Sequence, residues 1–146
     1  MKTTITLLNK TFTVSEKLVK EGVRFPNTDV HDQTRHNQFK VTIKGDAGRV
    51  SFDYYDSGFN NQAGKVSMDE KDLKGAVDCF LRDAMTGGDS FEYFCDEMGY
   101  DTDSRAAEKI YKACVRYYKK AIKLFDDVPA AAEQISELAY AHGQEL

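Results

Sequence analysis

The sequence predicts an α+β fold in which N-terminal antiparallel strands and hairpins precede about four helices, the longest near residues 103–125. Two patterns carry this prediction. Apolar residues first alternate with polar ones, as in strands buried on one face, and later recur at spacings of three and four, as in amphipathic helices. The 146 residues suit a single domain, with a strand-rich part (1–57), an irregular loop (58–66) and a helical part (67–142).

The first two strands are predicted at Thr3–Leu8 and Thr11–Val14, because both segments are rich in β-branched residues. The polar pair Asn9–Lys10 between them is expected to turn the chain into a hairpin. The following segment, Ser15–Asn37, is polar and shows no sustained period. We expect it to be a loop that holds at most a short strand at Gly22–Phe25.

A second hairpin is predicted from strict alternation in Gln38–Lys44 and Arg49–Tyr55. The loop Gly45–Gly48 joins these two strands. The next segment, Asp56–Lys65, is rich in Gly and Asn, which tolerate left-handed backbone, and is expected to be irregular. The strands therefore end before residue 58.

The first helix is predicted over Ser67–Met85, where Ser67 and Glu70 have the spacing of a capping box. A short second helix follows, capped by Asp89 or Ser90 and ended by Gly99 in the left-handed conformation. Helical spacing predicts the following inward-facing residues for these two helices: Leu73, Ala76, Val77, Phe80, Leu81 and Ala84 in the first, and Phe91, Phe94, Cys95 and Met98 in the second.

The longest helix is predicted to start within Asp101–Ser104 and to end at Phe125. Its apolar residues span an arc of roughly 200°, wider than a surface helix needs. We therefore expect it to be covered on two sides, by the sheet and another helix or, as the alternative, by a second copy in a homodimer. A last helix is predicted through Ala141, with Pro129 in its first turn.

The polar face of the longest helix carries eight charges, of which Glu108 alone is negative. We call its seven cations the basic stripe, and they are the candidate binding residues: Arg105, Lys109, Lys112, Arg116, Lys119, Lys120 and Lys123. The stripe is either a solvated helix face or a docking site for phosphates or an acidic protein surface. Tyr111 and Tyr118 flank it and would stack on bases if they were exposed.

Signals of other chemistry are sparse. The cysteines Cys79, Cys95 and Cys114 lie in helical apolar patterns, so we expect three buried thiols and no disulfide. The alternating side-chain oxygens of Asp101–Ser104 resemble the start of a calcium-binding loop, but the glycine and the glutamate that such a loop needs at later positions are missing. Capping of the following helix explains why these polar residues are there. We predict no metal site, no cofactor, no catalytic residues and no enzymatic activity.

The bulk charge and the hydropathy pattern exclude some classes of protein. A net charge of -4 argues against a protein whose whole surface binds polyanions. The N-terminus lacks the apolar run of a signal peptide, and no stretch is long and apolar enough for a membrane span. We therefore expect a cytoplasmic protein that does not engage a membrane.

The segment SFEYFCDEMGYDTDSRAAEKIYKAC, from Ser90 to Cys114, resembles a stretch in small proteins encoded by bacteriophages and prophages. The resemblance extends weakly over Gln38–Phe125. It implies an accessory protein in the cytoplasm of a bacterial host that binds a host protein or nucleoprotein. Inhibition of a defence system such as a CRISPR effector is one such activity.

Two surfaces could serve that binding. The acidic residues along Asp69–Asp103 could imitate nucleic acid toward a basic partner, and the basic stripe could contact nucleic acid or an acidic groove. The alternative function is direct nucleic-acid binding through the basic stripe.

Overall fold

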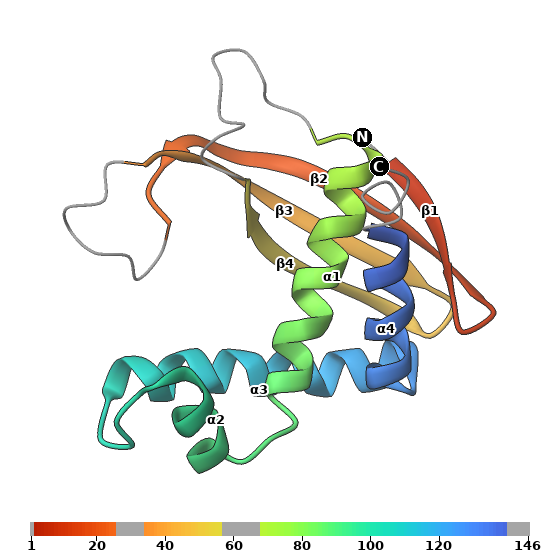
Figure 1. The fold of residues 1–146 in the computed structure, drawn as a ribbon. Helices are drawn as coiled ribbons and strands as arrows, with labels where there is room; N and C mark the ends of the chain where they lie inside the picture. The colour runs from red at the N-terminus through yellow and green to blue at the C-terminus, as the bar shows by residue number, and fades with distance from the viewer. Residues whose placement is uncertain (1, 26–33, 57–67, 140–146) are drawn as a thin grey trace.

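The structure, a computed structural model, describes residues 2–25, 34–56 and 68–139. In these residues four antiparallel strands precede four helices, which confirms the predicted α+β class (Figure 1). The strands form one sheet in the order β1-β2-β3-β4. The elements are β1 (Lys2–Leu7), β2 (Lys10–Val23), β3 (His36–Gly45), β4 (Gly48–Tyr55), α1 (Glu70–Thr86), α2 (Phe91–Met98), α3 (Arg105–Phe125) and α4 (Val128–Ala139).

The first hairpin turns at Leu8 and Asn9, one residue earlier than predicted. Both residues have positive φ, 53° and 62°, as the two central residues of a tight hairpin turn require. The expected loop after Val14 was wrong, because β2 continues to Val23 and pairs with β3. Its register shifts on either side of Lys20, and such irregularities break the alternation by which a strand is recognised.

The second hairpin confirms the prediction. Gly45 pairs with Gly48, and the residues of β3 and β4 that point to the core face each other across the ladder, as in Val41 opposite Phe52 and Ile43 opposite Val50. Apart from Asp56, the predicted irregular loop Asp56–Lys65 lies outside the described residues. Strand β4 is at the edge of the sheet and β3 lies next to it, and together they carry a large part of the buried face of the sheet.

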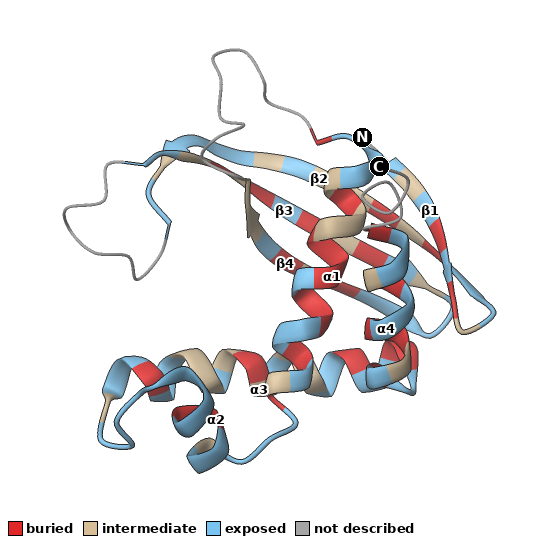
Figure 2. Cartoon of the chain, in the orientation of Figure 1, coloured by how far each residue is buried: buried red, intermediate tan, exposed pale blue. Residues whose placement is uncertain are grey.

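Helices α1 and α4 lie across one face of the sheet, and α3 crosses beneath both (Figure 1). Burial is concentrated between the sheet and these helices, whereas α2 is mostly exposed (Figure 2). The N-cap of α1 is Asp69, which forms a capping box with Asp72. The predicted Ser67–Glu70 box was therefore wrong; Ser67 lies outside the described residues, and the Asp69 carboxylate accepts from the Asp72 amide at 2.8 Å.

Helix α3 begins after its N-cap, Ser104, and packs against α1, α2, α4 and β4. The chain itself therefore covers this helix on more than one side, as the broad apolar arc predicted. Two residues of the arc do not face the core, because Ala106 is exposed and Ile122 is 39% exposed. The homodimer alternative stays a prediction.

Helix α2 and the first turns of α3 form a small second core of Phe94, Cys95 and Ala107. Its boundaries follow the predictions, since Ser90 is the N-cap and Gly99 ends the helix with φ 73°. Met98, expected to face inward, is 55% exposed, because the small core ends one turn before it.

Candidate functional site

The basic stripe lies in full on the exposed side of α3. All seven of its side chains are exposed. Their positions in the helix fall within an arc of about 100° and extend over about 27 Å of helix axis. The structure thus brings the predicted binding residues together as one straight row of cations.

The positive charge of the basic stripe is offset within α3 by one carboxylate. Lys112 forms an ion pair of 2.9 Å with Glu108, which lies at the edge of the arc. Since the whole chain nets -4 and α3 carries seven positive charges and one negative charge, the rest of the chain nets -10. The molecule is therefore electrically polarised, with its positive pole along α3.

The rings of the two tyrosines beside the basic stripe, Tyr111 and Tyr118, pack against other parts of the fold. Tyr111 packs its ring on Phe91 and Phe94, with centroids 5.4 Å away in both cases, and its hydroxyl donates to the carbonyl of Asp89. The Tyr118 ring lies so close to Gly88 that a Cβ there would be 2.9 Å from it. The stripe therefore offers charge to a partner and no free aromatic face for stacking on bases.

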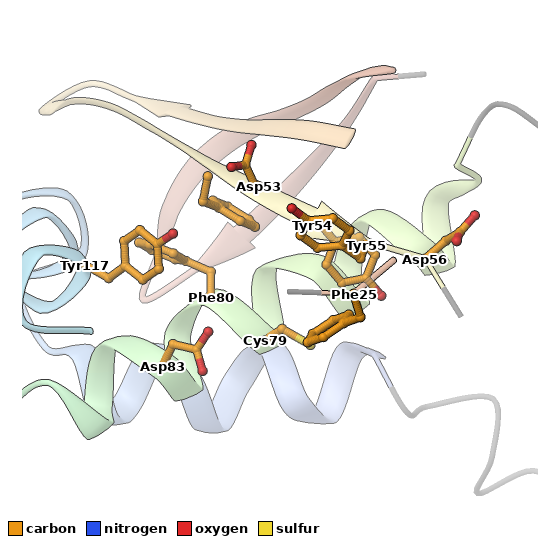
Figure 3. A pocket seen from close by; sticks show the side chains of 10 residues that line it. Phe25, Asp53, Tyr54, Tyr55, Asp56, Cys79, Phe80, Asp83 and Tyr117 are labelled. Atoms are coloured by element: carbon orange, nitrogen blue, oxygen red, sulfur yellow. The ribbon is translucent and has the colours of Figure 1, made fainter. Parts of the chain in front are cut away.

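A second feature, which the sequence did not reveal, is a pocket of about 410 Å³ between β4, α1 and α3 (Figure 3). We call it the aromatic pocket. At its floor the Phe52 and Phe80 rings are stacked at 4.7 Å, and Tyr117 meets Phe80 edge-on at 5.3 Å. Its lining residues are Phe25, Phe52, Asp53, Tyr54, Tyr55, Asp56, Cys79, Phe80, Asp83 and Tyr117.

Three carboxylates from the described part of the chain line the aromatic pocket. Asp83 reaches it from α1 and points toward the space between Tyr117 and Cys79, whereas Asp53 lies at the rim on β4 (Figure 3). Asp56 is held by the fold, since its carboxylate accepts from the Asn37 amide at 2.8 Å. Asp83 is therefore the carboxylate best placed to meet a bound group.

Burial shifts the titration of the groups in this pocket. It raises the pKa of the Asp83 carboxyl. It also raises the pKa of the Tyr117 hydroxyl, with further increases from the charges of Asp53 and Asp83. The pKa of the Cys79 thiol is raised by burial and then by the nearby Asp78 and Asp83 carboxylates. Asp83 and Cys79 are nevertheless exposed as whole residues, so the pocket is an acidic site that is open to solvent.

The cysteine prediction was correct for two of three residues. Cys95 and Cys114 are buried, but Cys79 is exposed and lines the aromatic pocket. Cys79 comes directly after the buried residues Val77 and Asp78 on α1, so its side chain lies just outside the buried face of the helix. All three cysteines are free thiols.

The aspartates before α3 have a local role. Asp101 accepts from the Asp103 amide at 3.2 Å, and Ser104 caps the helix by accepting from the Ala107 amide at 3.1 Å. Among the described residues, no three His, Cys, Asp or Glu side chains gather in a way that could hold a metal ion.

None of the helices in the described part of the chain is long and apolar enough to span a bilayer. In comparisons with known proteins, no family model, no curated protein and no solved structure matches the chain.

Proposed function

We propose that this protein acts by binding, without catalysis, and that the basic stripe docks on a polyanionic surface of a host protein or nucleoprotein. The observation that supports this most is the geometry of α3: seven exposed cations in one row, with a single carboxylate at its edge. Ordinary helix surfaces mix both signs, because alternating charges stabilise an exposed helix. A row of positive charges on a chain with negative net charge instead suits a partner whose surface is negatively charged.

The charge distribution favours a partner with a defined shape over free nucleic acid. Outside α3 the chain nets -10, so the rest of the molecule as a whole repels phosphates. The rings of Tyr111 and Tyr118 pack within the fold, so neither of these two residues beside the stripe is a stacking platform for single strands. The resemblance of Ser90–Cys114 to phage-encoded proteins suggests a bacterial host partner, and a defence nucleoprotein such as a CRISPR effector is the specific candidate.

Affinity capture from a bacterial lysate tests the proposal. The tagged wild-type protein is compared with a stripe variant, Lys112→Glu, Arg116→Glu and Lys119→Glu, with and without nuclease treatment. We expect the wild type to retain a partner that the stripe variant loses, because three reversed charges turn attraction into repulsion. An equal set of partners for both folded proteins would contradict docking through the stripe.

Direct nucleic-acid binding is the second candidate, favoured by the straight row of cations on α3. If about six cations each neutralise one phosphate, affinity for duplex DNA should fall with a slope near -5 in a plot of log affinity against log salt. The isolated protein and a labelled 20-nucleotide duplex provide the test. No binding in low salt would eliminate this candidate and leave the first.

A further inference from the structure

The aromatic pocket combines two features that together define a ligand. Its volume, about 410 Å³, lies within the range of small-molecule sites. Six of its ten lining residues are aromatic and three are aspartates, and none of the described lining residues is a cation. The site therefore has the chemistry that attracts a positively charged organic group.

The aromatic rings of the pocket come from four parts of the fold: the residues after β2, strand β4, and helices α1 and α3. Tyr117 projects from α3 on one side, and Phe25, Tyr54 and Tyr55 lie on the other, with Phe80 at the floor (Figure 3). Phe25 is 46% exposed, and its ring meets Tyr55 edge-on at 5.3 Å. Rings that face a shared space from several sides attract cations through their negative faces.

The carboxylate of Asp83 adds a charged acceptor. It projects from α1 toward the space between Tyr117 and Cys79 (Figure 3). Arg82, the next residue along α1, pairs with Asp78 at 3.1 Å, and Arg116 of α3 is exposed and belongs to the basic stripe. Packing around the Asp83 carboxyl raises its pKa although the residue is exposed, and a cation beside it favours the charged form.

We propose that the aromatic pocket binds an organic cation, a guanidinium group on a short aliphatic stem, with the cation at the Asp83 carboxylate beside the ring of Tyr117. A planar guanidinium can stack on an aromatic face while it donates hydrogen bonds to a carboxylate in its plane. An arginine side chain of a peptide and a free guanidino compound share this chemistry. The basic stripe plays no part, so this proposal stands or fails independently of the proposed function.

Matched ligands test the proposal on the full chain. Butylguanidinium and its neutral counterpart butylurea have nearly the same shape and differ in charge. Binding is followed by the NMR shifts of the aromatic ring signals of Tyr54, Tyr117 and Phe25. We expect butylguanidinium to bind at least about tenfold more tightly than butylurea, as the loss of a cation–π contact and a charged hydrogen bond would produce.

The variant Asp83→Asn should weaken butylguanidinium binding about tenfold and leave butylurea binding unchanged. The change is isosteric, and an unchanged backbone NMR spectrum outside the pocket verifies the fold. Asp53→Asn, at the rim, should have a smaller effect in the same direction. Asp96→Asn, an exposed residue on α2 outside the pocket, is the matched control and should have none.

The source of the cation is decided by a capped tripeptide, acetyl-Gly-Arg-Gly-amide, and its citrulline analogue. Tighter binding of the arginine peptide than of butylguanidinium assigns the pocket to a protein side chain, and weaker binding assigns it to a free compound; both results support the proposal. Equal affinity for butylguanidinium and butylurea, no binding of either, or unchanged butylguanidinium binding in Asp83→Asn would overturn it.

Discussion

Gly87, where α1 ends, should not tolerate a methyl group. The residue has ordinary helical backbone, with φ -67°, so an alanine there suffers no conformational penalty. The obstacle is contact: a Cβ on Gly87 would lie 2.6 Å from the Val115 nitrogen of α3 and closer still to the Cys114 carbonyl. Both are backbone atoms, which cannot rotate away as a side chain can.

The cost of Gly87→Ala can be worked from this contact. Ordinary van der Waals contact begins at 3.4 Å, so the two helices must separate by about 0.8 Å or more. A gap of that size forfeits a quarter to a half of the dispersion energy across the contact. Because overpacking a core costs about 1–3 kcal/mol and the neighbours here are backbone, we expect a loss of about 3 kcal/mol, or about 6–12 °C in Tm.

Urea denaturation followed by circular dichroism measures this loss. Gly75→Ala, in the same helix, is the matched control, because a Cβ at Gly75 meets nothing within 4 Å. That variant should gain about 0.5–1 kcal/mol from the higher helix propensity of alanine. A Gly87→Ala protein within about 0.5 kcal/mol of the wild type would refute the close approach of α1 to α3.

Two further predictions concern groups at or near the aromatic pocket. Near pH 8 the exposed Cys79 should react first with iodoacetamide, and Cys95 and Cys114 should react only on unfolding. Burial shields both of these thiols from the reagent, and it raises the pKa of Cys114 to about 11. Mass spectrometry of timed samples would show the order of labelling, and early labelling of Cys114 would contradict its buried position. Because the folded pKa of Asp83 is raised, its contribution to stability is present below the ordinary pKa of about 4 and is lost as pH rises through the folded value. Asp83→Asn should therefore be more stable than the wild type at pH 7, with a difference that shrinks toward about pH 4 in urea denaturation; a variant less stable at pH 7 would contradict the shift.

The sequence predicted those elements whose signal is local. Regular alternation located β3 and β4, and Ser90, Gly99 and Ser104 marked helix ends because capping depends on a few neighbouring residues. The extension of β2 to Val23 was missed, because its pairing depends on β3 and its bulges break the alternation. The cap of α1 was misplaced because Ser67 and Asp69 are both good N-cap residues.

The two candidate sites also differ in how far local sequence could predict them. The basic stripe lies on one helix, so helical spacing alone is enough to group its residues. The aromatic pocket joins Phe25, Asp53, Asp83 and Tyr117 from separate elements, and only tertiary packing brings them together. The signal within the sequence was limited to the run of aromatic and acidic residues at the end of β4, residues 52–56, and to Asp83 three positions after Phe80 on α1.

The most direct test of the central claim, that the basic stripe is the docking surface, compares two triple variants of equal net charge. One reverses Lys112, Arg116 and Lys119 to Glu, and the other reverses Lys17, Lys40 and Lys44, which are exposed on the sheet face opposite the core. Each protein is eluted from heparin, a polyanion, with a salt gradient at pH 7. The account predicts that the sheet variant elutes close to the wild type and that the stripe variant is not retained. Equal losses would assign the effect to net charge, and retention of the stripe variant with loss of the sheet variant would place the docking surface on the sheet; either result would contradict the claim.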